Sequence, residues 1–283
     1  MKKKFLYILT ENLNFFYKLN KILTEKKISF KVLTLGSKIP SIASLILTTS
    51  EEVPKFETKN NNVKFLIYSP EIFFEDYILR VIAAYRIEYK EHYSKLTFSI
   101  DPGKRIGLMV FLDNYYLDSY CCYKMEELIE KIIKIIKIFQ KNNPYLIDVD
   151  FKFGRGVLSI TYELVKRIYK IFKNRQNMRV YLIDESRTSK IKNLNKFKGK
   201  KLSKDEISAL ILAMREGMEV THENYIKIFN KIKSKKLKLN PINKRDSESN
   251  NGASFKIEDI IEKVLSGEYS LIESSQLIKN DDI

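Results

Sequence analysis

Apolar and polar residues alternate along the first third of the chain with two periods, one typical of short strands and one typical of helices. Apolar runs predict strands at 4–9, 29–35, 42–47 and 63–67. Helical spacing predicts helices at 12–26 and from Ser69 to about 88, and Ser69-Pro70-Glu71 is typical of a helix N-terminus. Because helices alternate with short buried strands, residues 1–93 are expected to form a small α/β domain on a parallel sheet, with no indication of its role.

The middle of the chain, residues 94–220, has a different order of elements. Three consecutive strands are predicted at 96–100, 106–112 and 115–123, followed by an amphipathic helix at 125–141. A strand at 145–151, a helix at 157–174, a strand at 179–183 and a helix at 203–217 complete the domain. The predicted fold class is therefore α/β, with a mixed sheet built in the order β-β-β-α-β-α-β-α.

The last part of the chain, residues 221–283, is predicted to be a basic extension. Residues 224–238 have the pattern of an amphipathic helix, and no acid interrupts the lysines between Lys231 and Lys238. Residues 240–254 have the polar composition of a flexible linker. Short helices are expected at 255–265 and 270–278.

The net charge of the chain indicates which kinds of molecule it can bind. The formal net charge is +16, from 51 Lys and Arg against 35 Asp and Glu. This excess favours polyanions, with DNA or RNA first and an anionic membrane surface second; a lysine-rich, solubilising surface is the alternative explanation. No apolar run approaches the roughly 18 residues that a membrane span needs, so no membrane partner is expected.

The few cysteines and histidines exclude other kinds of site. Cys121 and Cys122 are neighbours on a predicted strand, so their side chains point to opposite faces and do not share a metal. With His92 and His222 as the only histidines, a zinc site of Cys and His ligands is not expected. The apolar start of the chain turns polar at Thr10, too early for a signal peptide, and we expect a cytoplasmic protein.

Three acidic motifs lie in order within the middle domain. The first is Ile100-Asp101-Pro-Gly-Lys-Arg-Ile-Gly107, the second is Leu182-Ile-Asp184-Glu185-Ser-Arg-Thr-Ser189, and the third is Asp205-Glu-Ile-Ser208-Ala-Leu-Ile-Leu-Ala213. Together with the order of strands and helices, these motifs resemble the RNase H-like superfamily over residues 96–217. The resemblance is to its RuvC/YqgF-type members, which are Holliday-junction resolvase-like nucleases.

The resemblance implies that Asp101, Glu185 and Asp205 are the catalytic carboxylates and hold Mg²⁺ or Mn²⁺ in a two-metal site. Phosphodiester hydrolysis by two metal ions needs several carboxylates converging on one point, which is an independent reason to group these acids. Asp148 and Asp150 lie two apart on the fourth strand and share a face, so either can supply a fourth metal ligand. If they lie within a central strand they need pairing or a metal, and if the strand ends before them they are exposed.

Each of these acids also has a structural explanation. Asp101 before Pro-Gly is a common turn residue, and Glu185 can be a solvated strand end. Asp205 in the first turn of a helix gains from the helix dipole whether or not it binds metal. Ser203 and Glu206 fit a capping box, so Glu206 is expected to be structural.

Basic residues cluster between the second and third acidic motifs. Eight lysines and arginines and no acid lie from Arg187 to Lys204, where a phosphate backbone would approach the proposed metal ligands. Arg155 lies between two glycines, which allow close backbone approach. The candidate nucleic-acid-binding residues are Lys104, Arg105, Arg155, Arg187, Lys190, Lys192, Lys198, Lys200 and Lys201. A solvated lysine loop is the alternative explanation.

The sequence therefore predicts a metal-dependent nuclease that acts on structured or branched DNA or RNA, with a homodimer as a candidate assembly. The alternative is a nucleic-acid-binding or scaffold protein that has this fold without catalysis. Ser208 and the aspartates of the fourth strand depart from the family's pattern and favour that alternative. A nucleotide-dependent protein of the related actin-like fold is less favoured, because no pair of Gly-rich phosphate loops is visible.

Overall fold

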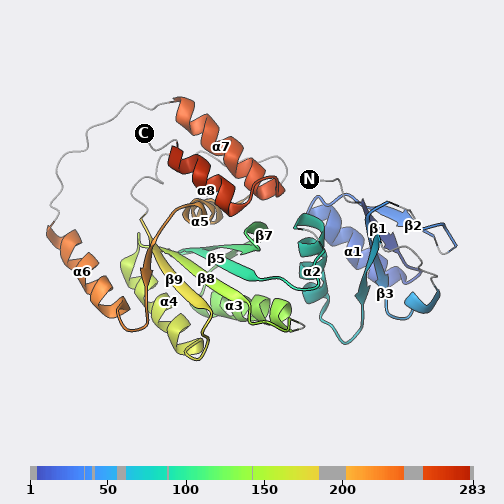
Figure 1. Cartoon of the computed structure of the whole chain (residues 1–283), viewed down its shortest axis with the longest axis horizontal. Coiled ribbons are helices and arrows are strands. Elements are labelled where there is room, and N and C mark those ends of the chain that lie inside the picture. The colour runs from blue at the N-terminus through green and yellow to red at the C-terminus, as the bar shows by residue number, and fades with distance from the viewer. Residues whose placement is uncertain are drawn as a thin grey trace. The chain divides into compact units, whose positions relative to one another are not determined.

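The computed structural model describes residues 5–34, 36–39, 42–55, 62–87, 89–141, 143–184, 202–238 and 251–280. The chain forms two compact units, Met1–Lys90 and Glu91–Ile283. Each unit has its own sheet, coloured blue to cyan in the first and green to gold in the second (Figure 1). Within the described ranges, no helix is both long enough and apolar enough to cross a membrane.

The first unit contains the predicted parallel sheet. Its strand order is β2-β1-β3-β4, and every neighbouring pair is parallel. The strands are β1 (Phe5–Leu9), β2 (Lys31–Leu33), β3 (Ser44–Thr49) and β4 (Val63–Tyr68), and the helical segments are α1 (Leu13–Glu25), η1 (Val53–Lys55) and α2 (Phe74–Arg86). The prediction that this region is α/β is confirmed.

A buried carboxylate ties together the loops that follow β1 and β3. Glu52 accepts hydrogen bonds from the hydroxyls of Thr10 and Thr49, both at 2.7 Å, and from the backbone N–H of Glu11 at 2.5 Å. Burial acts to raise the pKa of Glu52, but these hydrogen bonds favour the carboxylate and leave its pKa below the ordinary value. The network explains how the carboxyl ends of two neighbouring strands are held together.

Helix α2 does not begin where the sequence pattern predicted. Its first residue is Phe74 rather than Ser69. The Ser69 hydroxyl instead donates to the Glu71 carboxylate at 3.0 Å, and the Ile72 N–H donates to the Ser69 carbonyl. These bonds form a turn before the helix, so the Ser-Pro-Glu motif belongs to that turn.

The second unit is built on a six-stranded mixed sheet in the order β10-β9-β8-β5-β6-β7. Strand β5 pairs antiparallel with β6 and parallel with β8, and β9 continues the parallel part. The strands are β5 (Lys95–Asp101), β6 (Ile106–Leu112), β7 (Tyr115–Cys122), β8 (Asp148–Gly154), β9 (Met178–Ile183) and β10 (Met218–Val220). The predicted order β-β-β-α-β-α-β-α is confirmed, and β10 is an additional edge strand that pairs antiparallel with β9.

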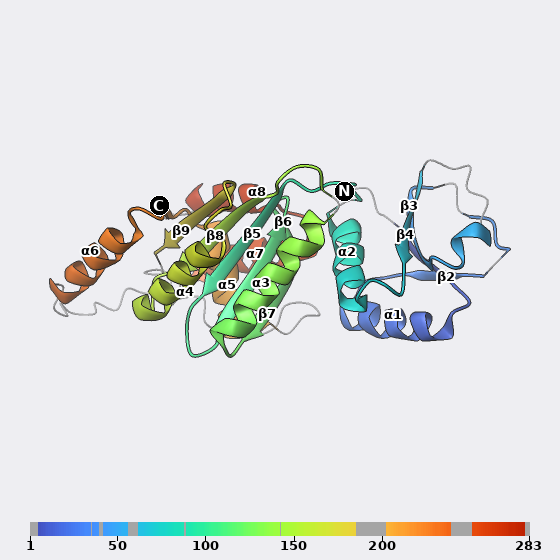
Figure 2. The ribbon, with the colours of Figure 1, turned by 90° about the horizontal axis from the view of Figure 1, so that it is seen from below.

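Helices cover both faces of this sheet. Helices α3 (Met125–Gln140) and α4 (Leu158–Ile171) lie on one face, and α5 (Lys204–Met214) lies on the other (Figures 1 and 2). Helices α7 (Asn251–Ser266) and α8 (Leu271–Asn280) pack on the outer side of α5, which joins them in one apolar cluster with Met109 and Phe111 of the sheet. Helix α5 is therefore enclosed between the sheet and the C-terminal helices.

The C-terminal part is more ordered than the composition indicated. Helix α7 begins at Asn251, within the stretch expected to be a linker, and its later residues Ile260, Ile261 and Val264 are buried against α5. The predicted basic helix is present as α6 (Tyr225–Lys238). Residues 239–250, the rest of the expected linker, lie outside the described residues.

Gly107 sets how closely α5 approaches the sheet. A Cβ atom at this position would lie 2.0 Å from the carbonyl oxygen of Asp205 and 2.9 Å from the backbone nitrogen of Glu206. Contacts this short do not occur, so only glycine allows the first turn of α5 to rest directly on β6.

We expect Gly107→Ala to displace the start of α5 and to lower the free energy of unfolding by roughly 1–3 kcal/mol, the range for overpacking a filled interior. Chemical denaturation measures this loss. Gly103→Ala is the matched control, because its Cβ would meet one carbonyl oxygen at 3.0 Å in a turn. Equal stability of the two variants would show that the close approach of α5 is not needed.

Candidate functional site

Asp101 and Asp205 come to the same place on the sheet from different elements. Asp101 ends β5 and lies directly opposite Gly107 of β6, which in turn lies opposite Cys121 of β7. Residues directly opposite each other in antiparallel strands share a face, so Asp101 lies on the face that α5 covers. The backbone of Asp205 rests on Gly107, between Asp101 and Cys121 in this row. The structure thus brings together two of the three acids named from the sequence.

The start of α5 is fixed by the predicted capping box. The Ser203 hydroxyl accepts from the Glu206 N–H at 3.2 Å, and the Glu206 carboxylate accepts from the Ser203 N–H at 2.8 Å. Glu206 also accepts from the Ser119 hydroxyl at 2.6 Å, which ties the helix to β7. The structural role predicted for Glu206 is confirmed, and it fixes the position of Asp205 one residue earlier.

Asp205 has a cationic partner in the structure. Its Oδ2 lies 3.0 Å from Nε of Arg105, and the thiol of Cys121 lies 4.0 Å from the same oxygen. The side chain of Arg105 is 47% exposed, so it can leave the carboxylate at little cost. Lys104 is exposed beside it in the same turn. Lys104 and Arg105, which the sequence analysis named as candidate nucleic-acid contacts, therefore lie beside the acid pair.

The carboxyl ends of β8 and β9 carry further charges. Arg155 follows β8 and forms an ion pair with Asp184, which follows β9. The guanidinium of Arg215, after α5, donates to the carbonyl oxygen of Asp184 at 3.1 Å. Because β5 and β8 are parallel and Ile100 lies opposite Phe153, Arg155 leaves the sheet close to the end at which Asp101 lies.

The third predicted carboxylate and most of the predicted basic contacts lie outside the described residues. These are Glu185 and the basic residues Arg187, Lys190, Lys192, Lys198, Lys200 and Lys201. Asp184, the last described residue before them, shows that the chain enters this segment from the carboxyl end of β9.

The fourth strand begins later than predicted, and this corrects the expected role of its aspartates. It runs from Asp148 to Gly154 rather than over 145–151, so Asp148 and Asp150 lie at its start. Asp150 lies opposite Thr97, four residues before Asp101, which corresponds to about 13 Å along the strand. Asp148 is exposed and farther away still. Neither acid reaches Asp101, so neither supplies the fourth ligand.

Asp150 is instead neutralised by cations. Its side chain is 6% exposed and lies 2.7 Å from Nζ of Lys95 and 2.9 Å from Nε of Arg179. The buried carboxylate therefore joins β5, β8 and β9 at the ends of these strands that lie away from the acid pair. This pairing offsets the cost of burying a carboxylate. From the sequence alone, Asp150 could have been paired, bound to a metal or exposed.

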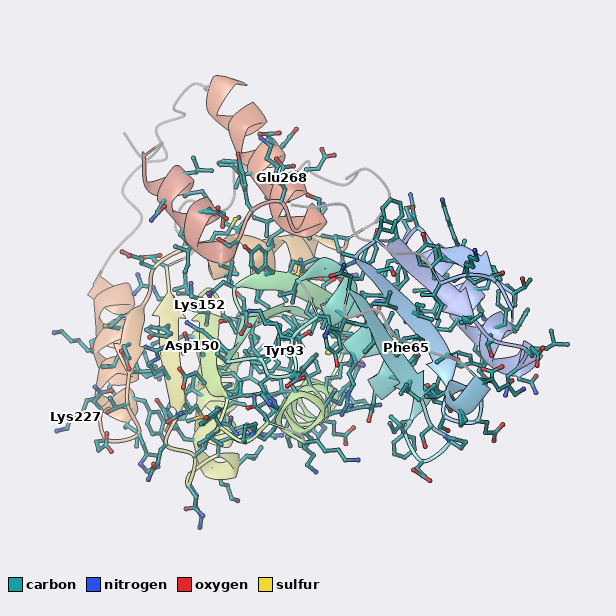
Figure 3. The ribbon with its side chains drawn as sticks, turned by 45° about the vertical axis from the view of Figure 1, so that its right-hand side comes forward. Phe65, Tyr93, Asp150, Lys152, Lys227 and Glu268 are labelled. Carbon is teal, nitrogen blue, oxygen red and sulfur yellow. The ribbon has the colours of Figure 1, made fainter. Side chains whose placement is uncertain are left out.

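Lys152 is a positioning residue that the sequence patterns did not indicate. It follows Asp150 on the same face of β8 (Figure 3), and its Nζ donates to the carbonyl oxygens of Ala213 and Arg215. Cations at a helix C-terminus are favourable, so Lys152 holds the last turn of α5 to the sheet. The signal was a single lysine in the apolar alternation of the fourth strand. Helix α5 is thus fixed at both ends, by Gly107 and by Lys152.

Burial changes the acidity of Lys152. Desolvation lowers the pKa of its ammonium group to about 8, and the charge of Lys95 acts in the same direction. The carboxylates of Asp150 and Glu216 oppose this shift without cancelling it.

The acid pair fits part of a divalent-cation site. Carboxylate oxygens are the donors that Mg²⁺ and Mn²⁺ prefer, and Mg²⁺ commonly binds through one or two carboxylates while keeping several waters. Among the described residues, no group of three or more acids, histidines or cysteines is arranged to hold a metal. Asp101 and Asp205 are thus a two-carboxylate set within the described residues.

No family model and no curated protein matches the sequence. Among solved structures, the chain is similar to Marinitoga piezophila Argonaute in complex with a 5′ OH guide RNA and target DNA, with 11% sequence identity and a TM-score of 0.28. The match covers 65% of this chain and 39% of the Argonaute chain.

The low pKa of Lys152 makes stability depend on pH. Between about 8 and 10.5 the unfolded chain keeps this proton while the folded protein has lost it, so the free energy of unfolding rises with pH. Relative to Lys152→Met, the wild type should gain about 2 kcal/mol between pH 8 and pH 10, measured by urea denaturation at each pH. A difference that stays constant across this window would contradict the burial argument.

Proposed function

We propose that this protein is a metal-dependent nuclease of the RuvC/YqgF type that acts on structured or branched nucleic acid. The observation that carries the proposal is the meeting of Asp101 and Asp205 across Gly107, at the carboxyl end of the first strand of the mixed sheet. The order of strands and helices in the second unit is the one that the resemblance implied, and this supports grouping the two acids. Glu185, which follows β9, would be the third carboxylate.

The proposed chemistry divides between a metal and the protein. Mg²⁺ or Mn²⁺ would be held by Asp101 and Asp205, together with Glu185, and would supply an activated water and charge stabilisation for phosphodiester hydrolysis. Helix α5 holds Asp205 in place, because its capping box and Lys152 fix the two ends of the helix. The protein's own contribution is therefore a rigid presentation of the carboxylates.

Cations around the acid pair would bind the phosphate backbone. Lys104 and Arg105 lie in the turn after Asp101, and Arg155 leaves the sheet at the neighbouring strand. The basic residues from Arg187 to Lys201, which follow β9 in the sequence, would add contacts. Such phosphate contacts bind nucleic acid largely without regard to sequence, in a salt-dependent manner.

One observation favours a second candidate, a nucleic-acid-binding protein without catalysis. Arg105 forms a 3.0 Å ion pair with Asp205. An acid with a purely structural role would have such a partner. In the nuclease, Arg105 would move from the carboxylate to a phosphate when metal and substrate bind. In the binding protein, the ion pair would persist in the complex.

Asp101→Asn separates the two candidates. We expect it to reduce cleavage of a labelled four-way junction or single-stranded DNA in Mn²⁺ by at least 100-fold while binding is retained, because the variant removes a metal ligand and no phosphate contact. Denaturing gels measure cleavage, and fluorescence anisotropy measures binding.

Asp148→Asn is the matched control, since this exposed aspartate lies at the opposite end of the sheet. It should cleave at the wild-type rate. If wild type and Asp101→Asn cleave equally, or if neither cleaves any substrate while both bind, the nuclease proposal is wrong, and in the second case the binding protein is the better description.

A further inference from the structure

Helices α4 and α6 present cations on a face of the molecule that the candidate active site does not use. Helix α4 covers the sheet face opposite α5, so it lies on the other side of the sheet from Asp205 (Figure 2). Helix α6 packs beside α4. The acid pair and this helical face are separated by the sheet itself.

The aromatic side chains of α6 pack against α4. Tyr225 and Phe229 are buried, and their rings lie 5.9 and 5.3 Å from the ring of Tyr162 on α4. The Tyr169 ring, two turns further along α4, lies 5.5 Å from Tyr225, and its hydroxyl donates to the Val220 carbonyl. Because both aromatic side chains are covered and Ile226 is a single exposed apolar side chain, the described part of α6 offers no continuous hydrophobic face of the kind with which amphipathic helices enter a membrane.

The remaining side of α6 is cationic. Its sequence holds six lysines and no acid, and Lys227, Lys231 and Lys233 are exposed. Lys227 projects away from the helix into solvent in Figure 3. Lys227 and Lys231 are one turn apart and therefore lie on the same side of the helix.

Helix α4 carries a matching row of lysines. Lys166 and Lys170 are exposed and follow Tyr162 at steps of four residues, so they continue the helix stripe that begins at the α6 contact, and the exposed Lys173 follows in the turn after the helix. The one acid of α4 is Glu163. Arg167 is tied to Glu126 at 2.6 Å and is not part of the row.

These lysines do not form ion pairs within the described part of the protein. Within the part of the chain that the structure describes, none of the five on the two rows has a carboxylate partner. The five are Lys166, Lys170, Lys173, Lys227 and Lys231. From Lys166 to Lys170 the row extends about 6 Å at 1.5 Å per residue, which is the span of roughly two phosphates along one strand.

We propose that this α4–α6 lysine face is a second nucleic-acid contact surface, which binds the phosphate backbone apart from the carboxylates. Helix α4 starts four residues after Gly154, so Arg155 at the edge of the candidate active site and the lysine row belong to one continuous segment. A strand held at Arg155 can follow α4 around the sheet edge and onto α6. The proposal shares its polyanionic partner with the proposed nuclease but does not depend on cleavage.

The test is a fluorescence-anisotropy titration of 40-nucleotide labelled single-stranded and duplex DNA in EDTA, in an Asp101→Asn background. These conditions exclude cleavage, so failure of the nuclease proposal does not affect the result. The variant Lys166→Gln/Lys170→Gln/Lys227→Gln/Lys231→Gln changes four exposed side chains. We expect at least a tenfold loss of affinity, and on duplex DNA a decrease of about 3 in the slope of log K against log salt.

The control removes the same charge elsewhere. Lys18→Gln/Lys21→Gln/Lys38→Gln/Lys64→Gln changes four exposed lysines of the first unit and should leave affinity and salt slope within twofold of the parent. Equal losses in the two quadruple variants would overturn the proposal in favour of a general charge effect, and unchanged binding by the α4–α6 variant would overturn it directly. Loss of binding to anionic phosphatidylserine vesicles without loss of DNA binding would assign the face to a membrane surface instead.

Discussion

The second unit depends on the direct contact between the first turn of α5 and the backbone of β6 at Gly107. Side chains normally separate a helix from the sheet on which it packs, as they separate two stacked sheets by about 10 Å, and here one position has no side chain. The absence of that Cβ lets the helix N-terminus reach the sheet, and it places Asp205 beside the strand that carries Asp101. The acid pair is therefore a consequence of backbone geometry.

The same helix is held at its other end by a charge. Lys152 crosses from β8 to the final carbonyls of α5, and the C-terminal helices cover the outer side of α5 with apolar residues such as Ile261 and Val264. Each of these contacts restricts the movement of α5. Arg105, exposed and at the surface, is the partner that can exchange for a metal or a phosphate.

Much of the fold could be predicted from the sequence because hydrophobic periodicity reports burial directly. The parallel sheet, the order of elements in the second unit and the capping box at Ser203 all follow from local patterns. The start of the fourth strand could not, because Tyr145 and Ile147 have strand-like character but precede the pairing with β5 that begins at Lys95. That shift of three residues removed Asp148 and Asp150 from the site. Pairing across the sheet is a long-range property, and the same applies to the role of Lys152.

Direct binding of a divalent cation to the acid pair tests the central claim most closely. Mn²⁺ titration followed by electron paramagnetic resonance counts free and bound ions without requiring a substrate. The account predicts that Asp101→Asn and Asp205→Asn each weaken Mn²⁺ binding at least tenfold, about 1.4 kcal/mol, while Asp148→Asn binds as the wild type does. Wild-type affinity in both site variants would contradict it, since the two carboxylates would then meet across Gly107 without sharing an ion.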